Sequence, residues 1–316
     1  MTNNNVQKNK NSTSIGIQIS YLFGISVCIS SVWFSGFEDN PRREFNNSRL
    51  SSLDKSVYSA NDTRYHYLEP TKLKGFPTVN PILLQVVKTI DIPISNRKSS
   101  GTGTAFKIGL DRWITARHVV NDCKEVFLSG KKIFNIFLPP SSDLAMLISQ
   151  PSLEDTFELG WMPDLKNKIL VRPDFKIGEQ GFSMGYPKGK PGQAHLMFAG
   201  YIGMKQHGAY HLKEPVKMWV ENQRQPKNLD QMGGISGGPI FDKEGHIVGV
   251  HVANSIRRGR AYSVDEYALT WLLQATKVHD TSSKTSVDQK VTLKNWSQIA
   301  EAWRKSGLIR KVLCSV

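Results

Sequence analysis

The chain of 316 residues has few cysteines, and none of them lies in a metal-binding motif. Cys28, Cys123 and Cys314 are too few for a scaffold held together by many disulfides. There is no CxxC and no Cys/His cluster with zinc-ligand spacing, so we expect neither a metal nor another cofactor. The GxxxxGK[ST] pattern is also missing, so we do not expect the glycine-rich segment GISGGP to be a phosphate-binding loop.

Acidic residues are scarce relative to basic ones. There are 27 Asp and Glu against 41 Lys and Arg, giving a formal charge of +14. This excess leaves nucleic acid, anionic lipid and acidic polymers open as partners. The basic residues are scattered, however, apart from Arg257–Arg260 and the C-terminal tail, so we do not expect a nucleic-acid binder. Hydrophobic residues make up 39% and charged residues 22%, which excludes wholesale disorder and a multi-span membrane protein.

One long stretch without charge lies near the N-terminus. Residues 15–34, IGIQISYLFGISVCISSVWF, follow a polar tail over 1–14. Twenty such residues are about the length that crosses a bilayer as a helix. We expect a single transmembrane signal-anchor, with the bulk of the chain outside the cytoplasm. A cleaved signal peptide and a buried core segment are the alternatives.

The remaining sequence divides by its pattern. Residues 35–75 are polar and irregular and predict a linker. From 76 to 278, short apolar runs broken by Gly, Pro and Asp predict many short strands and an all-β barrel or sandwich. This stretch ends in a helix that starts near Asp265. Residues 279–316 predict a second linker and an amphipathic helix over 292–305, which would dock on the barrel. Binding to a membrane surface or to a partner is the weaker alternative for this helix.

Three segments at strand boundaries carry residues of a hydrolytic site. They are TARHVV with His118, SDLAML with Asp143, and GGISGGP with Ser236. A serine hydroxyl needs a base to take its proton, an imidazole can be that base near neutral pH, and a buried carboxylate can orient the imidazole. The glycines around Ser236 permit a tight turn, so the N–H groups of Gly234 and Ser236 could hold an oxyanion.

With these residues the chain resembles the trypsin-like (chymotrypsin-fold) serine proteases. It is most similar to the bacterial disulfide-free branch with HtrA-type and glutamyl endopeptidase-type enzymes. The matching stretches are GTGTAFKIGLDRWITARHVV, SSDLAMLIS and GGISGGPIFDKEGHIVGVHVA. The resemblance implies a double six-stranded antiparallel β-barrel over about 76–278, with the triad in the cleft between the barrels. His118 would then be the base, Asp143 its orienting acid and Ser236 the nucleophile.

The sequence departs from the family pattern at some positions. Ile235 stands where an Asp or Asn normally precedes the nucleophile, and only 25 residues separate His118 from Asp143. The cysteine pair that many secreted members place around the histidine is also absent. The short interval implies trimmed loops in the first barrel.

Two residues near Ser236 predict different substrate preferences. His251, in GVHVA, resembles the histidine with which glutamyl endopeptidases and picornavirus-type processing proteases bind a Glu or Gln side chain. Asp230 lies six positions before Ser236 and would attract a cationic side chain. His251 could equally be a strand histidine with satisfied hydrogen bonds, and Asp230 an exposed loop carboxylate.

The leading hypothesis is a membrane-tethered serine endopeptidase acting on protein or peptide substrates. A catalytically inactive binding module on the same fold is the second hypothesis, motivated by Ile235. A binder of nucleic acid or anionic surfaces, driven by the net charge, is the third.

Overall fold

The computed structural model describes residues 63–69, 88–94, 99–109, 111–150, 175–255, 258–277 and 290–316. The predicted tail at 1–14 and transmembrane segment at 15–34 lie outside these residues. Within the described ranges, no helix combines the length and apolar character that a membrane crossing requires.

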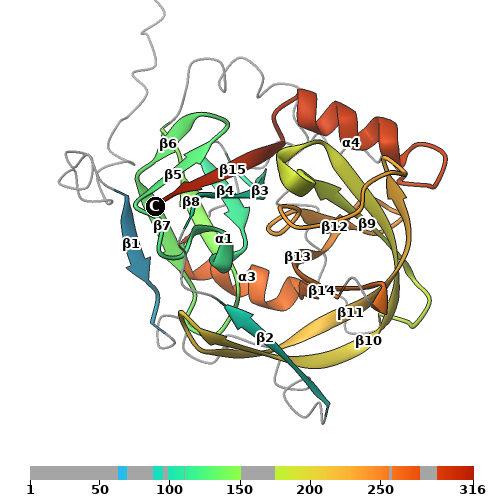
Figure 1. Cartoon of the computed structure of the whole chain (residues 1–316), viewed down its shortest axis with the longest axis horizontal. Coiled ribbons are helices and arrows are strands. Elements are labelled where there is room, and N and C mark those ends of the chain that lie inside the picture. The colour runs from blue at the N-terminus through green and yellow to red at the C-terminus, as the bar shows by residue number, and fades with distance from the viewer. Residues whose placement is uncertain are drawn as a thin grey trace, which may run out of the picture. The chain divides into compact units, whose positions relative to one another are not determined.

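The described strands form two sheets (Figure 1). The first sheet has eight strands in the order β1-β7-β8-β4-β3-β15-β5-β6. Their bounds are β1 Arg64–Tyr67, β3 Gly101–Lys107, β4 Arg112–Thr115, β5 Glu125–Leu128, β6 Lys131–Ile133, β7 Asn135–Leu138, β8 Ala145–Ile148 and β15 Ile309–Ser315.

The second sheet has seven strands in the order β11-β14-β13-β12-β9-β10-β2. Because β10 also pairs with β11, six of them close into an antiparallel ring, with β2 added parallel to β10. Their bounds are β2 Thr89–Ile94, β9 Gln180–Gly185, β10 Gly192–Gly208, β11 Leu212–Gln225, β12 Pro239–Phe241, β13 Ile247–Ser255 and β14 Arg260–Val264.

The all-β prediction is confirmed, but the strand count needs correction. The closed ring of the second sheet has the expected six strands, whereas the first sheet has eight. Strands β1 and β2 pair in parallel with β7 and β10, which an antiparallel barrel pattern does not predict. Strand β1 also falls within the predicted linker at 35–75. Its four residues, RYHY, are too few for a clear alternation.

Turns and helices near the second sheet follow the sequence signals closely. The turn between β12 and β13 is held by Asp242, whose Oδ1 accepts hydrogen bonds from the backbone N–H groups of Glu244 and His246. Helix α3 (Glu266–Ala275) begins after Asp265, whose side chain accepts from Ala268 N as an N-cap. A three-residue 3-10 turn, η7 (Pro187–Gly189), follows β9.

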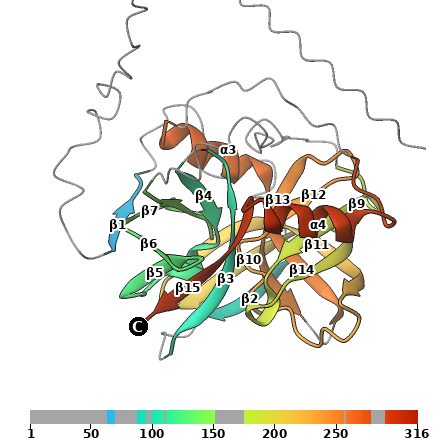
Figure 2. The ribbon, with the colours of Figure 1, turned by 90° about the horizontal axis from the view of Figure 1, so that it is seen from above.

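The C-terminal segment is part of the folded domain, so the predicted boundary at 278 is too early. Helix α4 (Trp296–Lys305) packs the Trp303 ring 4.3 Å from Phe241, as expected for a docked helix. The chain then crosses to the first sheet, where β15 lies between β3 and β5 (Figure 2). Sequence reasoning missed β15, although its buried Ile309, Val312 and Cys314 face the core.

A disulfide joins Cys123 to Cys314, which is a correction to the disulfide-free expectation. The two Cα atoms are 5.4 Å apart, and 191 residues separate the cysteines in sequence. The bond ties β15 to the turn that follows helix α1 (Arg117–Val120). Bridges that close long loops constrain the unfolded chain most, and losing one typically costs about 2–5 kcal/mol.

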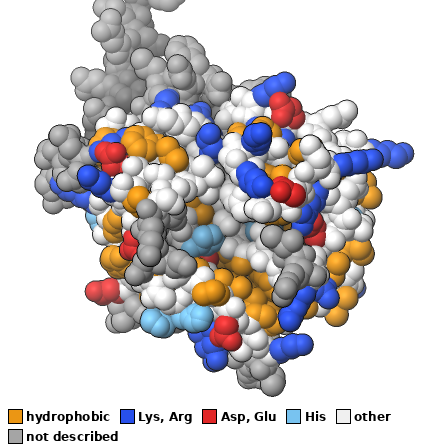
Figure 3. Space-filling view, in the orientation of Figure 1, with side chains coloured by type: hydrophobic (Ala, Val, Ile, Leu, Met, Phe, Trp, Pro, Cys, Tyr) orange, Lys and Arg blue, Asp and Glu red, His pale blue; other side chains and the backbone are white. Residues whose placement is uncertain are grey.

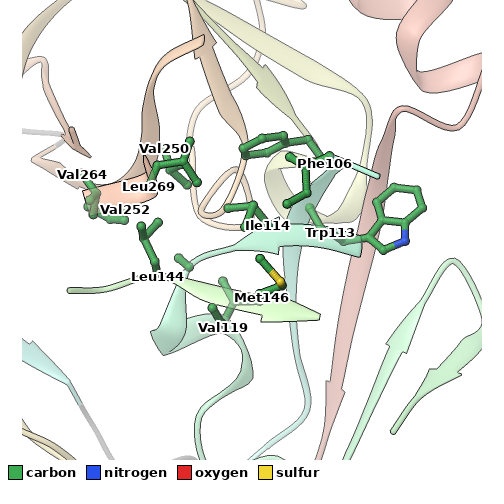
Figure 4. Packing of buried hydrophobic residues seen from close by; sticks show 14 of the residues in the cluster. Phe106, Trp113, Ile114, Val119, Leu144, Met146, Val250, Val252, Val264 and Leu269 are labelled. Atoms are coloured by element: carbon green, nitrogen blue, oxygen red, sulfur yellow. The ribbon is translucent and has the colours of Figure 1, made fainter. Parts of the chain in front are cut away.

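The main apolar core is shared by both sheets (Figure 4). Ile114 and Met146 of the first sheet, Val250 of the second and Leu269 of α3 belong to one buried cluster. Burying a side chain of this size contributes about 1.5–3 kcal/mol. Val119 and Leu144, the neighbours of His118 and Asp143 in sequence, point into the same core. Both site segments are therefore anchored by packing.

Candidate active site

His118 and Asp143 are in direct contact. His118 lies on helix α1, directly after β4, and Asp143 lies in the turn before β8. Asp143 Oδ2 is 2.7 Å from His118 Nδ1, and its Oδ1 accepts a hydrogen bond of 2.9 Å from His118 N. Asp143 is fully buried, whereas the side chain of His118 is 21% exposed. The carboxylate thus fixes an imidazole that still reaches the surface.

The loop that carries Ser236 packs against the residues preceding His118. Ser236 O accepts a hydrogen bond of 2.8 Å from Thr104 N of β3. The next residue, Gly237, has φ +87°, and a Cβ there would lie 2.3 Å from Thr115 Oγ1 and 2.8 Å from Ala116 N. Only glycine permits this approach. The residue after Ser236 therefore lies against Thr115 and Ala116, just before His118 in the sequence.

The glycine loop that carries the predicted oxyanion donors is held by hydrogen bonds from other segments. Gly233 O accepts from Lys188 N at 2.6 Å, and Gly234 O accepts from Thr104 Oγ1 at 2.8 Å. Gly234 has φ +98°, where a side chain would be strained. Within the described parts of the chain, the N–H groups of Gly234 and Ser236 donate no hydrogen bond. Both donors remain available.

Ile235 is accommodated by apolar packing. Its side chain is fully buried in a second cluster with Leu196, Trp219 and Met232. A carboxylate at this position would lie among apolar groups, at a large desolvation cost. The departure from the family pattern is therefore matched by the surroundings of the residue.

His251 is buried and both of its ring nitrogens have partners. Nδ1 is 3.0 Å from Ser183 Oγ, and Nε2 is 2.9 Å from Asn254 Oδ1. Burial lowers the pKa of His251 to about 4, so the ring is neutral at neutral pH. Since Oδ1 of Asn254 only accepts, Nε2 carries the proton and Nδ1 accepts from the serine.

Asp230 lies on the surface and is already paired. Its side chain is 67% exposed, and both carboxylate oxygens accept from Lys188 Nζ, at 3.0 and 3.1 Å. The hydrogen bond from Lys188 lowers the pKa of Asp230. This arrangement is that of the exposed loop carboxylate, the second of the two readings that the sequence left open.

Several residues around the site gave no recognisable signal in the sequence. Gln206, Tyr210 and Glu214 contact Asp143 from the β10–β11 hairpin, and Thr104 and Lys188 hold the glycine loop. Thr104 lies within the matched stretch that leads to His118, whereas the other four belong to no catalytic motif. Only the pairing of distant strands brings them to the site.

The part of the chain that carries the two sheets is similar to a trypsin-like peptidase domain. Residues 101–250 match the family model described as a trypsin-like peptidase domain, which confirms the resemblance. The glutamyl endopeptidase of Staphylococcus epidermidis is 25% identical over 236 residues, covering 65% of this chain and 77% of that protein.

Solved structures of proteases are also similar. The active form of the Rv3671c protease from M. tuberculosis covers 72% of this chain and 95% of its own, at 17% identity and a TM-score of 0.41. The MamO protease domain from Magnetospirillum magneticum covers 55% of this chain and 95% of its own, at 17% identity and a TM-score of 0.41.

Proposed function

We propose that the protein is a serine endopeptidase in which Ser236, His118 and Asp143 form the catalytic triad. The observation that carries this proposal is the 2.7 Å contact between His118 Nδ1 and Asp143 Oδ2, beside the loop of Ser236. The family match and the protease relatives support a peptidase. The apolar packing of Ile235 accounts for the departure that motivated the inactive binding module, which remains the alternative.

The proposed reaction follows from the positions of the protons. His118 Nδ1–H donates to Asp143, so Nε2 is the ring nitrogen that takes the proton of Ser236 Oγ. The oxygen attacks the scissile carbonyl, and the N–H groups of Gly234 and Ser236 stabilise the oxyanion. His118 returns the proton to the leaving amine, and an acyl-enzyme forms. Water then attacks the ester with the same histidine as base.

Neither the described structure nor the relatives supply a reason to propose nucleic acid as a partner. On the face in Figure 3, Lys and Arg side chains are dispersed among other residues and do not form one patch. Dispersed basic side chains attract nucleic acid only weakly and in a salt-sensitive way, because they form no continuous basic surface along which a phosphate backbone could bind. Protein or peptide substrates remain the proposed partners.

For substrate preference, we favour Glu or Gln before the scissile bond. Neutral His251 donates from Nε2 to Asn254, and the oxygen of a substrate Glu or Gln could replace Asn254 Oδ1 as acceptor. Asp230 is a poor candidate for a basic preference, because Lys188 neutralises it at the surface.

A peptide-library cleavage profile tests activity and preference together. We expect cleavage after Glu and Gln, and His251→Leu should lower kcat/KM for those peptides about 10- to 100-fold, since it removes a buried donor. Asp230→Asn, the matched control, should leave the profile unchanged. Cleavage after Lys or Arg that Asp230→Asn weakens would reverse the assignment.

We also propose that residues 15–34 tether the protein to a membrane, with the protease domain outside the cytoplasm. The Cys123–Cys314 bond supports this placement, because disulfides persist in oxidising compartments and are rare in the cytosol. The uncharged segment itself has the length of a membrane-crossing helix.

Membrane fractionation and thiol alkylation test this placement. We expect the full chain to stay in the membrane fraction after high-salt washing, and a chain starting at residue 35 to become soluble. Cys123 and Cys314 should resist alkylation until a reductant is added. A full chain that is soluble, or whose two cysteines alkylate without reductant, would contradict the proposal.

A further inference from the structure

We propose that the tip of the β10–β11 hairpin positions the acid of the triad, with Gln206, Tyr210 and Glu214 as positioning residues. The inference rests on the proposed function and goes beyond it, because these residues belong to the second sheet whereas Asp143 belongs to the first. The hairpin would set the direction in which the carboxylate faces His118.

The Asp143 carboxylate has four hydrogen-bond donors. Two come from His118, through N and Nδ1. The other two come from the hairpin, where Gln206 Nε2 donates to Oδ2 at 2.6 Å and Tyr210 OH donates to Oδ1 at 3.2 Å. Each oxygen therefore has one donor from the histidine and one from the hairpin. A rotation of the carboxylate would break bonds on both sides.

Glu214 holds the backbone of the same residue. Its Oε1 accepts a hydrogen bond of 2.8 Å from Asp143 N. Burial, together with the charge of Asp143, raises the pKa of Glu214 well above its usual range, which favours the neutral form of its carboxyl group beside the triad acid. Burial and Asp143 likewise raise the pKa of Tyr210, so its hydroxyl keeps the proton that it donates.

The hairpin turns these side chains inward by strand alternation. Gln206 pairs with Leu212, and Met204 pairs with Glu214, on the buried face of the two strands. The intervening Lys205 is exposed, as is Lys213 on the partner strand. A shift of one residue in register would bring Lys205 and Lys213 to the buried face in place of Gln206 and Glu214.

The tip is supported from two further sides. Strand β2 runs parallel to the end of β10, and Ala209 N donates to Ile94 O at 2.9 Å. The Arg117 guanidinium lies 4.5 Å from the centre of the Tyr210 ring. Arg117 directly precedes His118, so Tyr210 contacts the residue before the histidine with its ring and Asp143 with its hydroxyl. The tip is thus a fixed part of the site.

Tyr210→Phe and Gln206→Met test the inference, because each removes one donor and keeps the shape. Both should lower kcat about 10- to 100-fold with KM nearly unchanged. With one donor fewer, the Asp143 carboxylate keeps more of its negative charge, and it therefore stabilises the protonated imidazole of His118 more strongly. The acid limb of the kcat/KM profile, which reports His118, should therefore move to higher pH. Lys213→Met, on the exposed face, is the matched control and should change neither.

The outcomes separate this inference from the proposed function. If the wild-type protein neither cleaves peptides nor reacts with a fluorophosphonate, the proposed function fails. If the wild type is active and the folded Tyr210→Phe protein keeps its kcat and its acid limb, the positioning role is overturned. A lower kcat with an unchanged acid limb also overturns the positioning role, because a non-specific structural defect around the site would give the same result. Tyr210→Phe decides the question even if Gln206→Met does not fold.

Discussion

Ser236→Ala should reduce peptide hydrolysis by roughly a million-fold while the protein stays folded. The substitution removes only the hydroxyl group, which is the proposed nucleophile. Ser236 is 9% exposed, and its backbone oxygen remains bound to Thr104 N, so the loop should keep its conformation. Steady-state kinetics on a cleaved peptide, with thermal unfolding as the fold check, measure the effect.

Ser100→Ala is the matched control, because Ser100 is an exposed serine just before β3. It should leave both hydrolysis and unfolding unchanged. If the Ser236→Ala protein retained more than a few per cent of the wild-type rate, Ser236 could not be the nucleophile. The catalytic part of the proposal would then have to be abandoned.

Asp143→Asn should lower kcat by roughly ten-thousand-fold with little change in KM. The asparagine keeps the shape of the side chain, but its amide N–H₂ can donate to His118 Nδ1. That favours the tautomer with the proton on Nε2, where the base must accept one. The substitution also removes the negative charge that stabilises the imidazolium during reaction.

The expected result for Asp143→Asn is a slow enzyme that still binds its peptide. Inhibition by a non-cleavable substrate peptide measures that binding directly. A variant that retained its rate would show that His118 does not depend on Asp143 in catalysis, despite the 2.7 Å contact. Asp242→Asn, at a carboxylate that caps the β12–β13 turn, tests whether any buried Asp gives the same loss.

The central parts of the site could be predicted from sequence because each is encoded locally. His118 follows a strand of buried residues, and the glycines around Ser236 record a turn and a close approach that only glycine allows. Helix α3 and the β12–β13 turn could also be predicted from sequence, because Asp265 and Asp242 accept hydrogen bonds from backbone N–H groups only a few residues away.

The missed parts depend on contacts between distant residues. Strand β15 fits between β3 and β5 only after both have formed, and its cysteine meets Cys123 across 191 residues. Gln206 and Tyr210 reach Asp143 because a long hairpin crosses from the second sheet. Short strands such as β1 have too few residues for a periodic signal. No short-range sequence pattern predicts these long-range contacts.

The most direct measurement of the central claim is mass spectrometry of the folded protein after reaction with a fluorophosphonate. We expect one covalent adduct per chain, located on Ser236. It should be absent in Ser236→Ala and should form much more slowly in His118→Ala. A folded wild-type protein that forms no adduct, or forms it on another residue, would contradict the assignment of Ser236 as an activated nucleophile.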